Sequence, residues 1–199
     1  MEEIFEGVYR RGKQLFTYNG KKYRAWNPYR SKMAAAILKG LKEMWIGKDT
    51  KILYLGVATG TTASHLADIA KDGIIYGVEI SFKAMKKFVK LCKERDNLIP
   101  ILGDASKPSS YAAIVENIDL IYQDISQKNQ VEIFLKNMEK FKAPKGIIMV
   151  KARSIDVAME PKEVFKKVRE QIDKFYRVKQ MINLSPYAKD HVAILVEKD

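Results

Sequence analysis

Short apolar runs of strand length recur along most of the chain, and stretches with helical spacing separate them. Continuous apolar runs are typical of buried parallel strands, and we expect strands at 51–55, 74–78, 98–102, 118–123 and 146–150. Between them, apolar residues three or four positions apart predict amphipathic helices. The apolar stripes are Met85, Phe88, Val89 and Cys92; Val131, Phe134, Leu135, Met138 and Phe141; and Val164, Phe165, Val168 and Ile172.

Alternating strands and helices imply parallel strands joined by right-handed crossovers, and hence a doubly wound α/β sheet. The end of the chain departs from this pattern, because the strand candidates 175–184 and 191–196 are joined by a loop without a helix. We therefore expect a Rossmann-like, mostly parallel sheet that finishes with an antiparallel hairpin at its C-terminal edge.

The first 26 residues have a different texture, in which aromatic and basic residues alternate in short runs. Asn19-Gly20 lies between two such runs and predicts a two-residue hairpin turn. Asn27-Pro28 then predicts a helix N-cap followed by proline at the first helical position, with the helix running to about Lys39 and Gly40 beyond its end. We expect a small N-terminal β unit with a connecting helix over 1–45, and a Rossmann-like domain over 46–199.

Composition and charge narrow the class of protein. With 199 residues, 47% of them hydrophobic, the chain can bury a sizeable core and is not disordered overall. No apolar run is long enough to span a bilayer and the acidic N-terminus is unlike a secretory signal, so we expect a cytoplasmic protein. The single cysteine, Cys92, excludes a disulfide framework and a multi-cysteine zinc site. The net charge of +12 favours a polyanionic partner such as nucleic acid, although a high lysine content is also typical of heat-adapted proteins.

Ligands of open α/β sheets bind beyond the carboxyl ends of the strands, so the loops that follow the strands carry the candidate site. The first of these loops, 56–62, has the sequence Gly-Val-Ala-Thr-Gly-Thr-Thr. Its two glycines permit a tight turn close to a ligand, and its threonines can cap the next helix. The loop lacks the glycine spacing of a dinucleotide site and the lysine of a P-loop, and on its own it is equally consistent with a structural turn.

Acidic residues follow the next three strands in turn. Glu79 lies about 20 residues after the glycine loop, where a carboxylate can accept hydrogen bonds from both ribose hydroxyls of an adenosine. Asp104 can bind the exocyclic amine of adenine, Ala105 leaves room for the ring, and Asp124 enters the same crevice. The ordered set resembles the S-adenosyl-L-methionine site of a Rossmann-like methyltransferase. An NAD-dependent oxidoreductase shares the fold and the acid of the second strand but requires the missing glycine pattern.

Methyl transfer requires alignment of the two reactants and removal of a proton from the nucleophile. Four residues are candidates for this work: Lys32, Asp124, Lys151 and His191. In a lysine-rich chain most lysines are solvated surface charges, and a lone histidine is more commonly structural, as we expect for His65. Lys151 is the stronger lysine candidate because it ends a strand with an apolar interior.

The chain resembles a known family, fibrillarin, and in particular its short archaeal members. The similarity covers nearly the whole chain. The stretches that carry it are Asn27-Pro28-Tyr29-Arg30-Ser31-Lys32, Leu53-Tyr54-Leu55-Gly56-Val57-Ala58-Thr59-Gly60-Thr61-Thr62, Tyr76-Gly77-Val78-Glu79, Tyr122-Gln123-Asp124-Ile125-Ser126-Gln127 and Lys151-Ala152-Arg153-Ser154-Ile155-Asp156.

The resemblance implies an enzyme that methylates ribose 2′-hydroxyls of rRNA and, in archaea, tRNA. It further implies a ribonucleoprotein with a box C/D guide RNA that selects the target, a Nop-family scaffold protein and a kink-turn-binding subunit related to a ribosomal protein. The family's Lys-Asp-Lys-His tetrad matches Lys32, Asp124, Lys151 and His191. The cofactor contacts are expected at Gly56, Ala58, Gly60, Thr61, Thr62, Glu79, Ile80, Asp104, Ala105, Asp124, Ile125, Ser126 and Gln127. The Gly/Arg-rich N-terminal tail of the eukaryotic form is missing, which agrees with an archaeal source.

Two roles for Lys151 stay open: it loses its proton and acts as the base, or it remains charged and stabilises the developing alkoxide. We expect Asp124 to orient Lys151, and His191 to orient the group or relay a proton. Arg153 and the basic residues of the N-terminal unit are candidates for an RNA-facing surface. Their other interpretations are a solvated hairpin or a docking face for the scaffold protein. The competing functions are a non-catalytic RNA-binding subunit and a methyltransferase acting on a small molecule or a protein.

Overall fold

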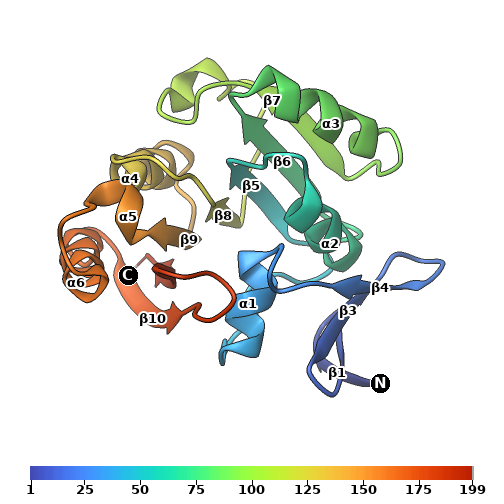
Figure 1. The fold of residues 1–199 in the computed structure, drawn as a ribbon. Helices are drawn as coiled ribbons and strands as arrows, with labels where there is room; N and C mark the ends of the chain where they lie inside the picture. The colour runs from blue at the N-terminus through green and yellow to red at the C-terminus, as the bar shows by residue number, and fades with distance from the viewer. Residues whose placement is uncertain (199) are drawn as a thin grey trace.

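The structure, a computed structural model, describes residues 1–198 and contains two sheets (Figure 1). The strands are β1 (Glu2–Phe5), β2 (Val8–Arg11), β3 (Gln14–Tyr18), β4 (Tyr23–Trp26), β5 (Lys51–Leu55), β6 (Ile74–Glu79), β7 (Leu98–Leu102), β8 (Leu120–Gln123), β9 (Lys145–Lys151), β10 (Arg177–Asn183) and β11 (His191–Glu197). The helices are α1 (Lys32–Leu38), α2 (Thr61–Ile69), α3 (Phe82–Cys92), the 3₁₀ helix η1 (Pro108–Ser110), α4 (Gln130–Phe141), α5 (Ala152–Ile155) and α6 (Pro161–Ile172). No helix of the described chain combines the length and the apolar character needed to cross a membrane.

The larger sheet confirms the predicted fold class. Its strand order is β10-β11-β9-β8-β5-β6-β7, and the pairs among β5, β6, β7, β8 and β9 are parallel. β11 lies between β9 and β10 and is antiparallel to both, so the expected antiparallel hairpin forms with β10 at the edge of the sheet. The strand order reverses between β5 and β8, and this switch point is where a ligand crevice is expected in such sheets.

Helices cover both faces of the large sheet, as the helical stripes predict. In Figure 1, α2 and α3 lie on one side of the sheet and α4 and α6 on the other. Two hydrophobic clusters correspond to these two layers: one contains Phe88 of α3, and the other contains Phe134 of α4 and Val168 of α6. Because each helix buries one apolar stripe against the sheet, the loops at the carboxyl edge are held on a rigid base.

The turn between β3 and β4 differs from the predicted two-residue Asn-Gly turn. Tyr18 is opposite Tyr23, so residues 19–22 form the loop. The side-chain oxygen of Asn19 accepts hydrogen bonds from the backbone N–H groups of Lys21 and Lys22. The prediction was wrong because Asn19 acts through its side chain as the acceptor within the loop, and the turn is displaced along the chain.

Helix α1 begins later than predicted. Asn27 caps a separate turn, in which its side chain accepts from Tyr29 N and its carbonyl accepts from Arg30 N. The helix starts at Lys32 with Ser31 as its N-cap, and Ser31 Oγ accepts from Ala34 N. The predicted end is confirmed: α1 ends at Leu38 with Lys39 as the C-cap, and Gly40 follows with a φ of +97°. The later start places Lys32 on the first turn of the helix.

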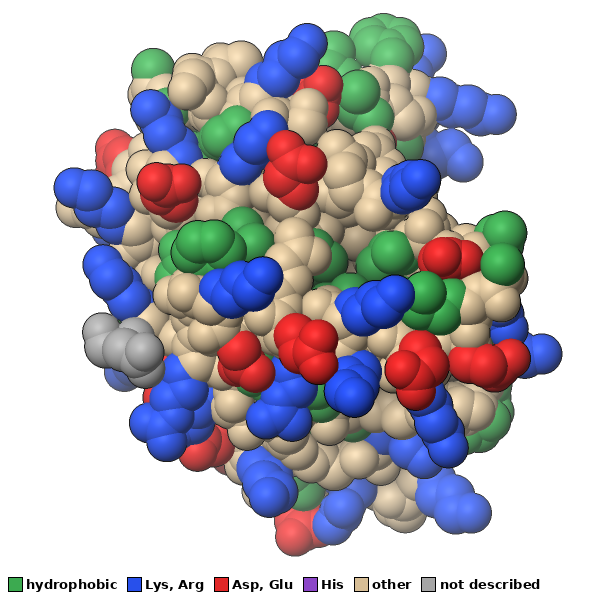
Figure 2. Space-filling view, turned by 90° about the vertical axis from the view of Figure 1, so that its left-hand side faces the viewer, with side chains coloured by type: hydrophobic (Ala, Val, Ile, Leu, Met, Phe, Trp, Pro, Cys, Tyr) green, Lys and Arg blue, Asp and Glu red, His purple; other side chains and the backbone are tan. Residues whose placement is uncertain are grey.

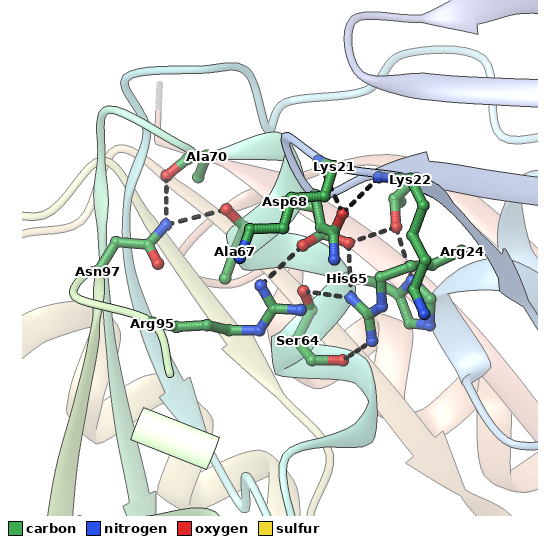
Figure 3. Close-up of polar contacts among 12 residues, drawn as sticks. Lys21, Lys22, Arg24, Ser64, His65, Ala67, Asp68, Ala70, Arg95 and Asn97 are labelled. Atoms are coloured by element: carbon green, nitrogen blue, oxygen red, sulfur yellow. Dashed lines mark hydrogen bonds and ion pairs between the residues drawn. The ribbon is translucent and has the colours of Figure 1, made fainter. Parts of the chain in front are cut away.

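A buried carboxylate joins the small sheet to helix α2 and to the segment that follows α3 (Figure 3). Asp68 of α2 accepts hydrogen bonds from Thr17 of β3 and Arg24 of β4, and Arg95, which follows α3, forms an ion pair with it at 3.0 Å. His65 Nδ1 lies 2.7 Å from Thr17 Oγ1, in agreement with the structural role expected for this histidine. One hydrophobic cluster also runs through both sheets, and the division into 1–45 and 46–199 stays a prediction.

Candidate functional site

A hollow lies at the carboxyl ends of the parallel strands, where the strand order reverses. It has a cavity volume of about 240 Å³ and continues into open solvent. Ten of the predicted cofactor residues line it: Gly56, Ala58, Glu79, Ile80, Asp104, Ala105, Asp124, Ile125, Ser126 and Gln127. The sequence therefore predicted most of the residues that line the hollow, although the role of each residue stays a prediction.

Three predicted cofactor residues lie outside this hollow. Gly60 and Thr61 line a neighbouring depression between the glycine loop and the small sheet. Thr62 is buried, and its hydroxyl donates to the hydroxyl of Ser31 at 2.9 Å. Through Ser31, the N-cap of α1, Thr62 fixes the helix that carries Lys32.

The two glycines of the loop after β5 are needed for different reasons. Gly56 has a φ of +77°, and a Cβ atom there would collide with the carbonyl group of Asp124, so the close approach of two site loops requires glycine. Gly60 has a φ of +87°, and a Cβ atom there would press on Phe88 of α3. Gly56 therefore shapes the hollow, whereas Gly60 serves helix packing.

The carboxylates of the hollow are held by backbone and hydroxyl donors. Glu79 accepts from the N–H groups of Ala58 at 3.0 Å and Ser81 at 2.8 Å, one on each oxygen. Asp104 Oδ1 accepts from both the hydroxyl and the N–H of Ser106, and these bonds lower the pKa of the Asp104 carboxyl below its ordinary value. Each carboxylate keeps lone pairs for a ligand, because two oxygens offer about four acceptor positions.

The four tetrad candidates come from distant parts of the chain and gather beside the hollow. Lys32 of α1 donates to both oxygens of Asp124, at 2.7 and 2.8 Å. Lys151, the last residue of β9, is directly opposite His191, the first residue of β11. Asp124 was expected to orient Lys151, but its carboxylate instead binds Lys32, which α1 brings to the end of β8.

Electrostatics favour a neutral His191. Burial lowers the pKa of the imidazole below its ordinary value, and the ammonium groups of Lys32 and Lys151 lower it further, while a hydrogen bond to the Lys189 carbonyl and the charge of Asp124 oppose the shift. His191 Nδ1 is 2.7 Å from that carbonyl, which can only accept, so Nδ1 carries a proton and Nε2 is the free acceptor of the neutral ring. The ring can therefore accept a proton at Nε2.

The basic residues predicted to face RNA are not equally available. Arg24 is bound to Asp68 and Ser64, and its side chain is 23% exposed, so most of its donors are engaged within the protein. The Arg153 guanidinium donates to Asp190 and to the carbonyls of Val157 and Met159, with 40% of its side chain exposed. Figure 2 shows the face that carries α4 and α6, where basic and acidic side chains are interspersed.

Sequence reasoning missed part of the wall and one buried amide. Val78 and Gly103 also line the hollow. Each is next in sequence to a predicted residue, Glu79 or Asp104, and this proximity is the signal by which they could have been predicted. Ile133 reaches the hollow from α4, and no sequence signal marked it. Gln130, at the start of the same helix, is fully buried and hydrogen-bonded to the backbone of both Gln127 and Lys151.

Comparisons with known proteins agree with this geometry. The sequence model of the family described as fibrillarin matches residues 2–199. A fibrillarin-like rRNA/tRNA 2′-O-methyltransferase of Archaeoglobus fulgidus is 50% identical over 98% of both chains, and one of Methanocaldococcus jannaschii is 44% identical over 96% of this chain and 94% of its own.

Two solved structures extend the comparison. A fibrillarin in complex with Nop5p has a TM-score of 0.95, with 46% identity over the full length of both chains. Fibrillarin of Aeropyrum pernix with natively bound S-adenosyl-L-methionine has a TM-score of 0.83, with 39% identity over 92% of this chain and 88% of its own.

Proposed function

This chain belongs to the fibrillarin family, and on that basis we propose that it methylates ribose 2′-hydroxyls of rRNA and tRNA with S-adenosyl-L-methionine as the donor. The observation that carries the proposal is the position of the Lys32–Asp124 pair. Asp124 both lines the hollow and binds an ammonium group, so the tetrad candidates adjoin the proposed donor site. A proton-handling cluster at the edge of such a hollow fits transfer to a hydroxyl group.

The donor set of the hollow suits S-adenosyl-L-methionine. Glu79 offers carboxylate oxygens to the ribose hydroxyls, and Asp104 offers them to the exocyclic amine of adenine. Gly56 and Ala58 bring backbone close to the ligand without bulky side chains. The bound group supplies a methyl carbon already activated by a sulfonium centre, so the chain need not activate the leaving group.

Replacing Glu79 with alanine should weaken S-adenosyl-L-methionine binding about 10- to 150-fold, since a hydrogen bond to a charged group contributes roughly 1.5–3 kcal/mol. Isothermal titration calorimetry measures the change in Kd. Glu94→Ala, which removes an exposed carboxylate after α3, is the matched control and should leave Kd unchanged. If the two variants bind S-adenosyl-L-methionine with the same Kd, the assignment of Glu79 as a cofactor-binding residue is contradicted.

In the mechanism that we propose, the residues of the tetrad have different roles. The two oxygens of Asp124 hold Lys32, so this carboxylate and ammonium form a fixed, nearly neutral pair at the end of β8. The Lys151 ammonium stabilises the negative charge that develops on the ribose oxygen. His191 accepts the hydroxyl proton at Nε2, and its Nδ1–H bond to the Lys189 carbonyl fixes the orientation of the ring.

The pH dependence follows from His191. Its pKa is lowered, so the ring is neutral at pH 7 and becomes protonated only below its ordinary value of about 6.5. We expect kcat to be flat near neutrality and to fall on an acidic limb below pH 6.5 or so, as Nε2 gains a proton. His191→Gln should lower kcat and remove that limb, as measured by pH–rate profiles at saturating donor and RNA. A limb that persists in this variant belongs to another group and contradicts the assignment.

The proposal includes the protein and RNA partners of the chain. The Nop-family scaffold is supported by the solved fibrillarin/Nop5p complex, to which this chain is similar over its full length. We propose that a box C/D guide RNA selects the target nucleotide and that a kink-turn-binding protein completes the particle. Arg153, which lies two residues after Lys151 and has 40% of its side chain exposed, is the candidate RNA contact.

Reconstitution tests the function. The chain, a guide RNA, the two partner proteins and an RNA with the complementary sequence are incubated with donor labelled in the methyl group, and the labelled position is mapped. We expect one labelled ribose, and no label when that nucleotide carries a 2′-deoxyribose. Label on a base or a protein would refute the function, as would binding of NAD in place of S-adenosyl-L-methionine.

A further inference from the structure

Lys151 lies beyond the part of β9 that is hydrogen-bonded to β8. The pairing of β8 with β9 ends at Gln123, which is opposite Ile148, and the chain then leaves the sheet as the loop that lines the hollow. On the other side of β9, Ala152 N donates to Asp190 O. Hydrogen-bonded pairs alternate along antiparallel strands, so at the Lys151–His191 pair the backbone groups of Lys151 point away from β11.

The carboxamide of Gln130 occupies the place that a neighbouring strand would take. Its Oε1 accepts from Lys151 N at 3.0 Å, and its Nε2 lies 3.4 Å from Lys151 O. The same Nε2 donates to the carbonyl of Gln127 at 2.7 Å. Gln123 Nε2 donates to the backbone carbonyl of Gln130 at 2.6 Å and fixes the start of α4. One fully buried side chain therefore connects the loop at the hollow to the strand end that carries Lys151.

We propose that Gln130 is a positioning residue for methyl transfer, which sets the place of the Lys151 ammonium relative to the donor through the backbone of Lys151. The inference rests on the proposed function. Gln130 does not line the donor hollow itself, and we infer that it acts on the reaction mainly through Lys151.

The two attachments of Gln130 are unequal, and this gives the proposal a specific kinetic signature. The Gln127 carbonyl also accepts from the backbone N–H of Gln130 at 3.2 Å, so it keeps a donor when the side chain is lost. Lys151 N has Gln130 Oε1 as its acceptor, and loss of the carboxamide leaves this N–H without that partner. Loss of the carboxamide should therefore disturb the lysine more than the donor loop.

Gln130→Met removes both polar atoms and nearly preserves the shape of the side chain. We expect kcat to fall about 10- to 100-fold, because a displacement of about 1 Å is costly in a preorganised site, while the Kd for S-adenosyl-L-methionine changes less than about threefold. Gln130→Glu keeps an acceptor for Lys151 N and should recover part of the lost kcat. The assays use the reconstituted complex, below the melting temperature of every variant.

A double-mutant cycle separates positioning from general stability. In a Lys151→Ala background, Gln130→Met should lower kcat by less than about twofold, because the group through which it acts is gone. Asn97→Leu is the matched control: this amide also binds two backbone carbonyls, those of Ala67 and Ala70, but at the opposite edge of the sheet. It should lower the melting temperature without lowering kcat.

The proposal is overturned if Gln130→Met keeps the kcat of the parent, or if its full effect persists without the Lys151 ammonium. It is also overturned if Gln130→Glu recovers none of the lost activity. These outcomes require an active parent. A parent chain that transfers no methyl group to ribose would refute the proposed function instead, so the two failures are distinguishable.

Discussion

Lys151→Ala should lower kcat about 10²- to 10³-fold while leaving the Kd for S-adenosyl-L-methionine unchanged, since removing one preorganised donor to a developing oxyanion costs that much in other enzymes. The reason lies in the pairing within the tetrad. Asp124 is bound by Lys32 through both oxygens, and within the described residues Lys151 forms no ion pair with that carboxylate. Single-turnover rates in the reconstituted complex, at saturating RNA and donor, measure the chemical step.

Lys151→Arg distinguishes the two roles of this lysine. A guanidinium stays charged throughout the working pH range and cannot act as a base. We expect arginine to be at least about tenfold more active than alanine, because the positive charge is retained. Equal activity of the two variants would contradict the charge-stabilising role and favour the base role. Lys86→Ala, an exposed lysine of α3, controls for the loss of one positive charge and should have the parental rate.

The apolar pattern predicted the inner strands of the large sheet because their continuous apolar runs are almost completely buried. The run 51–55 became β5 without a change of boundary, and the stripe in 164–172 became the buried face of α6. The errors arose where a polar side chain decides the local structure. Asn19 shifted the hairpin turn, and Ser31 took the N-cap that Asn27-Pro28 had suggested. At the start of α1 two residues, Asn27 and Ser31, can cap a turn, and the helix uses Ser31.

The candidate site also contains residues that the sequence predicts and contacts that it does not predict. Glu79 and Asp104 could be found because the fold rule places the ends of parallel strands at one edge. The Lys32–Asp124 bond joins residues 92 positions apart on a helix and a strand end, and no spacing in the sequence encodes it. Gln130 could not be predicted either, because its role depends on β8 ending before β9 does.

Asp68→Asn should lower the free energy of unfolding by about 3–5 kcal/mol, because it leaves two arginines without their counter-ion in a poorly solvated place. The Asp68 side chain is 0% exposed, and those of Arg24 and Arg95 are 23% and 16% exposed. Asparagine preserves the shape of the side chain, so the loss reports charge and not a cavity. Urea unfolding at pH 7 measures it, and Asp72→Asn, an exposed site, should change the free energy by less than about 0.5 kcal/mol.

The combined variant Arg24→Met/Asp68→Leu/Arg95→Met provides the decisive comparison. A buried ion network can be replaced by apolar residues of similar size at little cost, so this variant should be more stable than Asp68→Asn alone. Since Arg24 and Thr17 belong to the small sheet and Asp68 to α2, the single substitution should also loosen residues 2–26 before the rest unfolds. Limited proteolysis of Asp68→Asn should then cut first within β1 to β4. A variant that unfolds within 1 kcal/mol or so of the parent, with no early cleavage, would show that the apolar contacts between the two sheets are sufficient without the charge network.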